Sequence, residues 1–270
     1  MSRAVPVLMY HHVSPHPGLV TITPERFRAQ MRTLAERGWH TLSAADFAGF
    51  LNGQPVPPKS VLITFDDGYL DNYLHAHPVL VEYRLHALFF VVTGWLGDGP
   101  PRAPGQSDPP DHRECMRRIQ AGRPDDVMLR WSELAAMRAA GSGEFHSHTH
   151  THTRWDRTVA DATERRERLY DDLLRSRAAL SANLGAASEH LCWPQGYFDG
   201  DYQKVAMAAG FRYLYSVRRG VATPATDPAS IPRIVAKDRA GGWLRHRLAI
   251  YRWPGLAAWY ARAREGRDHA

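Results

Sequence analysis

The fold of this chain is decided by residues 60–68, which read Ser-Val-Leu-Ile-Thr-Phe-Asp-Asp-Gly. Six largely apolar residues are followed at once by two carboxylates and a glycine. A short apolar run bounded by turn residues is typical of a strand buried on both faces, as in a parallel sheet. Ligands of parallel α/β folds bind at the carboxyl ends of the strands. The segment therefore predicts a parallel α/β fold with Asp66 and Asp67 at its ligand-binding edge.

Apolar segments of similar length recur along the chain, and helical segments lie between them. Strands are expected at 5–10, 60–65, 87–93, 144–146, 190–193, 211–217 and 231–236. Helices are expected at 24–37, 43–50, 72–83, 131–140, 158–184 and 201–209. This alternation predicts an α/β fold with a single irregular (β/α) barrel, and a doubly wound open sheet is the alternative. The proline-rich residues 98–126 interrupt it and are expected to form a lid, helical around 114–121.

Composition narrows the class of protein. The chain has 270 residues, 44% of them hydrophobic, which is enough for a packed core. Its two cysteines, Cys115 and Cys192, make neither a disulfide framework nor a cysteine-type zinc site. A net charge of +6 favours anionic partners, but the excess is small and no nucleic-acid-binding module is visible, so no nucleic acid is expected. The apolar stretch 4–10 is too short for a secretory signal, which predicts a cytoplasmic protein.

A second group of polar residues lies at 146–152, where histidine alternates with serine or threonine. On a helical turn His148 and His152 would be neighbours able to hold one cation, and His146 and His150 form the competing pair. In an extended conformation all four would share one face. Two histidines and one aspartate are a common ligand set for zinc or a similar divalent ion.

Together these residues resemble the NodB-homology polysaccharide deacetylases, carbohydrate esterase family four. Residues 64–69 (Thr-Phe-Asp-Asp-Gly-Tyr) are similar to the first family motif, and Ser147-His148-Thr149 with His152 to the second. Residues 193–197 (Trp-Pro-Gln-Gly-Tyr) resemble the third. The opening residues 7–11 (Val-Leu-Met-Tyr-His) are similar to the branch that includes poly-N-acetylglucosamine deacetylases. The similarity covers roughly residues 5–235.

The resemblance implies a role for each matching residue. Asp67, His148 and His152 would bind a divalent metal, with zinc expected and cobalt or nickel also accepted by such a set. Asp66 would be the general base, and His11 the general acid. The neighbouring His12 is the rival for the acid role, although a buried structural position is expected for it. The residues expected to line the substrate groove are Tyr69, Trp193, Pro194, Gln195, Gly196 and Tyr197.

The third motif departs from the family pattern. Where the family carries an arginine that helps to position the base, this chain has Cys192, and Gln195 replaces a tyrosine. Arg233, within residues 231–234, is a candidate replacement that would act on Asp66. A surface or capping role for Arg233 is the alternative.

The last residues differ from the rest in composition. Residues 1–239 are expected to form the catalytic domain, and 240–270 a basic, aromatic-rich helical tail split at Pro254. Its residues include Trp243, Trp253, Trp259, Arg245, Arg252, Arg262 and Arg264. Aromatic and basic residues on one helix suit a membrane interface, whereas an apolar face would cover the barrel. Peripheral contact with the inner face of a membrane is therefore one expectation for the tail.

The resemblance implies a metal-dependent hydrolase that removes N-acetyl groups from an acetamido sugar, in a polysaccharide or a lipid-linked precursor. One alternative keeps the barrel and metal but acts on small amides or formamides. Another is a glycan- or membrane-binding module without catalysis. The presence of both Asp66 and Asp67 argues against a binding module, because such a module needs no base.

Overall fold

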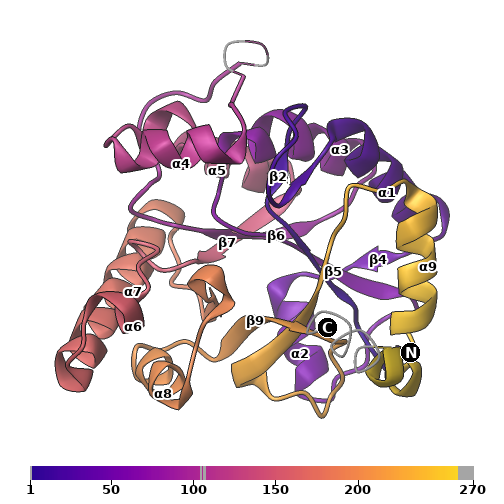
Figure 1. The fold of residues 1–270 in the computed structure, drawn as a ribbon. Helices are drawn as coiled ribbons and strands as arrows, with labels where there is room; N and C mark the ends of the chain where they lie inside the picture. The colour runs from indigo at the N-terminus through magenta and orange to yellow at the C-terminus, as the bar shows by residue number, and fades with distance from the viewer. Residues whose placement is uncertain (1, 104, 106–107, 261–270) are drawn as a thin grey trace, which may run out of the picture.

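The computed structural model describes residues 2–103, 105 and 108–260. Its central feature is a closed barrel of seven parallel strands (Figure 1). The strands are β1 (Val7–Tyr10), β5 (Ser60–Phe65), β6 (Ala87–Val91), β7 (Gly143–Ser147), β8 (His190–Cys192), β9 (Tyr213–Arg219) and β10 (Ile231–Val235). Because β1 pairs with both β5 and β10, the sheet closes on itself. The expected barrel is confirmed, and the open-sheet alternative is wrong.

The helices surround this barrel. Their bounds are α1 (Pro24–Glu36), α2 (Ala44–Leu51), α3 (His77–Glu82), α4 (His112–Gln120), α5 (Trp131–Ala139), α6 (Trp155–Thr158), α7 (Ala162–Leu184), α8 (Gly200–Ala208) and α9 (Gly241–Tyr251). The first two begin where their capping residues predict. Thr23 accepts a hydrogen bond from the backbone of Arg26, and Ser43 forms a capping box with Asp46.

Two expected helices differ from the structure at their first residues. The helix expected at 158–184 is confirmed as α7 but begins at Ala162, and the short helix α6, which ends at Thr158, precedes it. Asp161 caps α7 by accepting from two backbone N–H groups, which starts a separate helix. The helix expected at 72–83 begins as a π-helical turn, η1 (Asn72–Ala76), before α3. Such turns are often found at functional sites.

Alternate strand residues separate the core into two layers. Val7, Leu62 and Phe90 pack together in a fully buried cluster. Phe65 and Phe89 belong to a second cluster that includes apolar residues of α1, α5 and α9, and their rings stack 4.7 Å apart. Since successive strand residues point to opposite faces, the first cluster fills the barrel and the second joins it to the helices.

In the proline-rich segment after β6, the described residues around Arg102 are held by buried hydrogen bonds. Arg102 is buried and its guanidinium donates to both carboxylate oxygens of Glu133 in α5, at 2.8 Å each. It also donates to the carbonyls of Asp125 and Met128. The segment then forms α4 and the short helix η2 (Pro124–Asp126). It is an anchored wall beside the carboxyl ends of the strands (Figure 1).

The chain after the barrel returns to the first helix. α9 lies beside α1 (Figure 1), and Gly241 sits so close that an added Cβ would be 2.6 Å from the Ala29 carbonyl oxygen. A second helical stretch begins at Pro254, so the expected split is present. Trp253 and Trp259 are exposed. Arg262 and Arg264 lie outside the described residues. Among the described helices, none has the length and apolar character needed to cross a bilayer.

Candidate active site

The two adjacent carboxylates occupy a tight turn directly after β5. Asp67 has a φ of +73° and Gly68 a φ of +88°. An added Cβ at Gly68 would be 2.9 Å from a methyl group of Val91, so glycine suits this position on both grounds. A left-handed aspartate costs energy and is a feature of functional turns. The turn sends the two side chains to different partners.

Asp67 faces two histidines. Its Oδ1 lies 3.2 Å from His148 Nε2 and 3.4 Å from His152 Nε2. All three side chains are largely buried, and one ligand atom from each lies within 4.8 Å of the others. The structure thus brings together the three residues that the motifs nominate as metal ligands.

The local geometry of the histidines differs from both expected forms. Residues 148–152 form neither a helical turn nor an extended strand, and Thr149 and His152 have φ values of +64° and +59°. Asp172 in α7 shapes this loop, because its carboxylate accepts from the backbones of His150 and Thr151. The neighbouring histidines point elsewhere. His146 contacts Ser188 and His150 contacts Thr93, so the competing pair is not assembled here.

The orientation of His148 fits a metal ligand. Its Nδ1 lies 2.8 Å from the carbonyl oxygen of Cys192, which can only accept, so Nδ1 carries the proton. Nε2 then faces Asp67, on the side where a metal would bind. Without a metal, burial alone would lower the pKa of His148, but Cys192 and Asp67 outweigh burial and raise that pKa, so a bound divalent ion would take the place of a proton on Nε2. Burial lowers the pKa of His152 to about 4, which keeps that imidazole neutral at neutral pH. Two imidazoles and one carboxylate match the donors that zinc and similar divalent ions prefer.

Asp66 is held by Arg233, which reaches it from β10. Nη1 and Nη2 of the guanidinium donate to the two carboxylate oxygens at 2.7 and 2.8 Å, and both residues are buried. A register irregularity in β10 lies between Ile231 and Arg233. Burial alone would raise the pKa of Asp66, but Arg233 together with His11 and His148 outweighs burial and lowers that pKa. Asp66 is therefore an ionised, oriented carboxylate, and the surface reading of Arg233 is wrong.

Cys192 occupies the position of the missing family arginine. Its thiol is buried, and Arg233 Nη2 lies 3.0 Å from Sγ. Because the cysteine side chain is small, the guanidinium of Arg233 on β10 can lie beside it. The chain thus supplies an arginine to Asp66 from β10 where the motif would supply it from β8.

His11 and His12 have different surroundings, as their adjacency predicts. His11 lines the cavity, with Nε2 3.7 Å from Asp66 Oδ2. Burial is the main influence on the pKa of His11 and lowers it, against the opposing effect of Asp66 and Asp67. His12 is buried, with Nδ1 2.6 Å from a carboxylate oxygen of Asp71. His12 therefore has the buried, hydrogen-bonded position expected for it.

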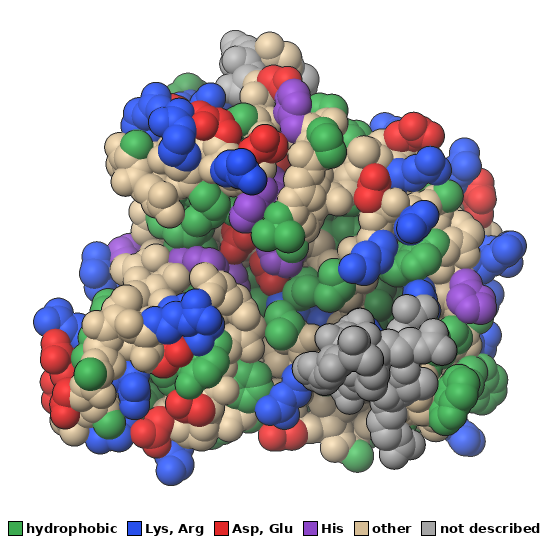
Figure 2. Space-filling view, viewed as in Figure 1, with side chains coloured by type: hydrophobic (Ala, Val, Ile, Leu, Met, Phe, Trp, Pro, Cys, Tyr) green, Lys and Arg blue, Asp and Glu red, His purple; other side chains and the backbone are tan. Residues whose placement is uncertain are grey.

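These groups lie in a cavity of about 410 Å³. Figure 2 shows acidic and histidine side chains gathered in a hollow of this face. Of the expected substrate-groove residues, Tyr69, Trp193, Gln195 and Gly196 line the cavity. Pro194 is buried between two lining residues and does not itself line the cavity, so its expected role in the groove stays a prediction. Tyr197 is also outside the lining and stacks under Arg154, 4.0 Å from guanidinium carbon to ring centre.

Other lining residues carry no signal in the sequence. Leu19 and Val20 come from the loop before α1, and His112 and Met116 from α4. Each belongs to a segment with no recognisable motif. Asp172, which holds the His148–His152 loop, is likewise one charged residue among many in α7.

The chain is similar to a known family of proteins. The polysaccharide deacetylase family profile matches residues 53–214. The Bacillus subtilis protein YxkH is 39% identical over 94 residues, 34% of this chain and 33% of that protein. The poly-beta-1,6-N-acetyl-D-glucosamine N-deacetylase of Staphylococcus aureus is 26% identical over 243 residues. That alignment covers 87% of this chain and 73% of the staphylococcal protein.

Solved structures show the same fold. The Streptococcus pyogenes deacetylase PplD, in complex with acetate, has a TM-score of 0.73 at 20% identity, covering 92% of this chain and 99% of that one. IcaB from Ammonifex degensii has a TM-score of 0.73 at 24% identity, covering 92% and 98%. The profile match spans more than half of the chain, and it agrees with the motifs around Asp66 and His148. The chain therefore belongs to the polysaccharide deacetylase family.

Proposed function

We propose that this chain is a metal-dependent hydrolase that removes N-acetyl groups from acetamido sugar residues of a polysaccharide. One observation carries the proposal. The two adjacent carboxylates have different partners within one cavity. Asp67 lies beside two histidines, whereas Asp66 is bound by Arg233 and lies near His11. A binding module that retained metal would need only Asp67 and the two histidines. The family membership and the similarity to an N-deacetylase of Staphylococcus aureus support the same reaction.

Asp67, His148 and His152 would hold the metal, and we propose zinc. A divalent ion bound there would polarise an acetyl carbonyl and make water more acidic. Cobalt and nickel accept the same donors. The protein's own part is to orient these donors. The Cys192 carbonyl fixes the tautomer of His148, and Asp172 fixes the loop that carries both histidines.

Asp66 would act as the general base. Arg233 keeps the carboxylate ionised and fixes its direction. Oδ2 also accepts from the Cys192 thiol, whereas Oδ1 keeps a lone pair beside its bond from Arg233 with which to accept a proton from water. His11 would act as the general acid that delivers a proton to the departing amine. Its place 3.7 Å from Asp66 puts base and acid on the same reacting group.

Trp193 contributes to binding in this proposal. It lines the cavity, and within the described ranges its indole N–H has no hydrogen-bond partner. A buried donor without a partner is costly, and a sugar or acyl oxygen would satisfy it.

The test is acetate release from N-acetylglucosamine oligomers. The protein is stripped of metal and refilled with zinc, cobalt or nickel. We expect acetate only from refilled protein, and none from an Asp66→Asn variant that still binds metal. An absence of acetate with every metal, combined with release of acid from small cyclic amides or formamides, would favour the small-amide hydrolase.

A second proposal concerns where the glycan is presented. We propose that the tail contacts an anionic membrane surface and that a lipid-linked sugar is among the substrates. Trp253, Leu256 and Trp259 are 56%, 43% and 62% exposed, and Arg252 lies over the Trp253 ring. Exposed tryptophan with adjacent arginine suits a membrane interface. Sedimentation with anionic liposomes tests this, and we expect loss of binding in a Trp253→Ala, Trp259→Ala double variant.

A further inference from the structure

Three titratable side chains beside the active site have no part in the proposed mechanism. Asp71, which precedes η1, and His12, which follows His11, are buried, and His112 is the first residue of α4. His12 Nδ1 lies 2.6 Å from Asp71 Oδ2, and His12 Nε2 lies 3.2 Å from His112 Nδ1. The side chains therefore form a continuous chain of hydrogen bonds from a buried carboxylate to α4.

The contacts of Asp71 favour an additional proton on His12. Asp71 Oδ1 accepts from the Val13 backbone N–H and from Asn72 Nδ2, at 3.2 and 2.8 Å, as an ionised carboxylate does. Among the described residues, no lysine or arginine contacts this carboxylate, and its one basic partner is the His12 imidazole. A buried carboxylate without a countercharge is costly, and an imidazolium at His12 supplies that charge. Both of its N–H groups then have acceptors, Asp71 and His112.

The ring of His12 is held in one orientation. It stacks on the ring of Tyr69, with the two ring centres 3.7 Å apart. The Tyr69 hydroxyl also lies 3.4 Å from His112 Nδ1, so one side chain contacts both imidazoles. A proton moves only between groups that lie within hydrogen-bond reach of each other. Tyr69 therefore helps to keep the two histidines at a distance that permits transfer.

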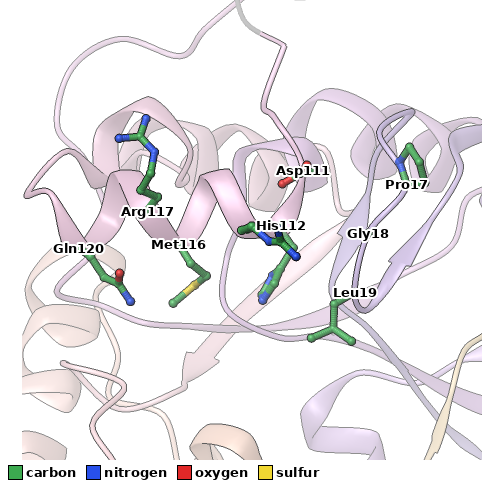
Figure 3. A pocket seen from close by; sticks show the side chains of 9 residues that line it. Pro17, Gly18, Leu19, Asp111, His112, Met116, Arg117 and Gln120 are labelled. Atoms are coloured by element: carbon green, nitrogen blue, oxygen red, sulfur yellow. The ribbon is translucent and has the colours of Figure 1, made fainter.

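His112 connects this chain of hydrogen bonds to two cavities. It lines the active-site cavity together with Asp66 and His11, and it also lines a neighbouring cavity of about 850 Å³ along α4. Figure 3 shows His112 pointing from the first turn of α4 toward the side where Leu19 lies. Leu19 is 70% exposed, so the second cavity opens to solvent there. Burial and the neighbouring His12 lower the pKa of His112, so this imidazole passes a proton on more readily than it retains one.

We propose that Asp71, His12 and His112 form a proton relay that recharges His11, the acid of the deacetylation, after each turnover. The His12 Nε2 proton passes to His112 Nδ1, while the His112 Nε2 proton passes into the cavity and on to His11. Each N–H bond that breaks is matched by one that forms on the next acceptor, and no electrons are exchanged. His12 is left neutral, with its Nδ1 proton still donated to Asp71. Solvent in the neighbouring cavity refills the relay by the reverse movement. The relay rests on the proposed deacetylase function for the identity of the acid.

The charged and titratable groups around His112 come from three parts of the chain. They are His11 and His12 after β1, Asp67 and Tyr69 after β5, and Asp111 at the start of α4. The two histidines lower the pKa of His112, and the two carboxylates raise it. A metal bound at Asp67 would offset the effect of that carboxylate, so the tests use zinc-loaded protein.

The pH dependence of turnover tests the relay. His112→Gln keeps a side chain able to hydrogen-bond His12, but an amide has no proton to transfer at these pH values. Water must then recharge the acid, and its proton concentration falls with each pH unit. We expect kcat of His112→Gln to lie within about threefold of wild type at pH 6 and at least about tenfold below it at pH 8.5, with metal content unchanged.

Imidazole added to the assay provides a mobile proton carrier and should restore most of the kcat that His112→Gln loses at pH 8.5. The matched control is His40→Gln, an exposed histidine outside both cavities, which should show neither the loss nor the rescue. A loss in His112→Gln that is equal at both pH values and insensitive to imidazole would show a structural role and overturn the relay.

A measurement without turnover keeps the relay and the proposed function separate. Nitrogen-15 NMR of the imidazoles shows which ring nitrogens carry protons. We expect His12 to be protonated on both nitrogens at pH 6, with its titration displaced in His112→Gln. A single protonated nitrogen on His12 at pH 6 overturns the relay. If NMR shows the coupled histidines but no metal supports acetate release, the proton store stands and the proposed function fails. If acetate is released and His112→Gln has the wild-type pH profile, the function stands and the relay fails.

Discussion

At the scale of single residues, the notable feature is the arginine that Asp66 receives from β10. The side chain of Arg233 donates to Asp66, Thr64 and the Ser216 carbonyl, so its position is fixed from several directions. A planar guanidinium can grip both carboxylate oxygens, whereas an ammonium cannot. The role of Arg233 therefore depends on its shape as well as its charge.

The first prediction concerns this shape. Arg233→Lys keeps a positive charge but loses the two-point grip on Asp66, so we expect kcat to fall by about 10- to 100-fold with metal content unchanged. Arg233→Met leaves a buried carboxylate without its countercharge and should lower the free energy of unfolding by about 3–5 kcal/mol. Steady-state kinetics and urea unfolding measure the two effects. Arg168→Lys, at an exposed position of α7, is the control. A wild-type kcat in Arg233→Lys would contradict the assigned role.

The second prediction concerns how stability depends on pH. It involves His86, which directly precedes β6 and so lies at the end of the barrel opposite to the active site. His86 is partly buried, with Nε2 3.2 Å from Glu144 and Nδ1 3.0 Å from the Gly141 carbonyl. Burial lowers the pKa of His86, but these partners outweigh it and the pKa is raised. A raised folded-state pKa stabilises the protein below the unfolded pKa, and this contribution is lost as the pH rises through the folded value.

The variant His86→Gln isolates that contribution. We expect it to destabilise the protein more at pH 5.5 than at pH 8.5, by a few tenths to about 1 kcal/mol given the partial exposure of the pair. Urea unfolding at the two pH values is the measurement. An equal loss at both values, or a greater loss at the higher one, would show that the ion pair contributes nothing through protonation.

The roles of single residues could be predicted where several of them form a motif with fixed spacing along the sequence. Asp67, His148 and His152 are nominated by motifs, and the structure places them together. Their geometry could not be predicted, because the loop conformation depends on Asp172, which lies 20 residues further along the chain. Arg233 could be suggested but not decided, since its partner is 167 residues away.

At the scale of elements, the break between β1 and β2 (His12–Val13) determines where His11 points. The π-helical turn η1 clamps this break. Asn72 Nδ2 donates to the His11 carbonyl at 2.7 Å, and the Asp71 carboxylate accepts from the backbone of Val13. Asp71 and Asn72 are fully buried, so these bonds fix the backbone on both sides of His12.

The third prediction follows from this clamp. Asn72→Ala leaves the His11 carbonyl without its donor, and we expect kcat to fall while KM and metal content change little. Stability should fall by about 1–3 kcal/mol. Asn183→Ala is the matched control, because Asn183 is exposed and makes one local hydrogen bond in α7. If both variants lose stability but keep kcat, the clamp is only structural.

The fourth prediction concerns the contact between α9 and α1. An added Cβ at Gly241 would lie 2.0 Å from Thr33 Oγ1 as well as close to Ala29, whereas Gly242 has open space around it. We expect Gly241→Ala to lower the free energy of unfolding by about 1–3 kcal/mol. Gly242→Ala should be neutral or stabilise by up to about 1 kcal/mol, because alanine favours helix. Equal stability of the two variants would mean that α9 shifts freely on α1.

The elements that could be predicted are those whose own residues carry a recognisable pattern, either an apolar run of several residues or a capping residue at the helix start. The apolar strands and the capped helices α1 and α2 are examples. The strands β2, β3 (Thr21–Ile22) and β4 (His40–Thr41) could not be predicted, because two residues carry no periodicity. The four-residue helix α6 carries no such signal either, and a tertiary contact holds it, the bond from Trp155 Nε1 to Asp172 in α7.

At the scale of the whole molecule, barrel closure brings distant segments to one site. His11 follows β1, Asp66 and Asp67 follow β5, His148 follows β7, and Arg233 lies on β10. In a parallel barrel these carboxyl ends meet at one face, which is why the site could be anticipated from strand order. The position of α4 could not be anticipated, because its segment has no motif. Contacts of Arg102 with Glu133 and of His112 with His12 hold it in place.

The central claim is that Asp66 and Asp67 have separate duties, one in proton transfer and one in metal binding. The most direct measurement determines metal content and acetate release in parallel for the wild-type protein, Asp66→Asn and Asp67→Asn. The fifth prediction is that Asp66→Asn keeps about one equivalent of metal and loses at least about 100-fold in kcat, whereas Asp67→Asn loses metal and activity together. Near wild-type turnover in Asp66→Asn, or full metal content in Asp67→Asn, would contradict this account.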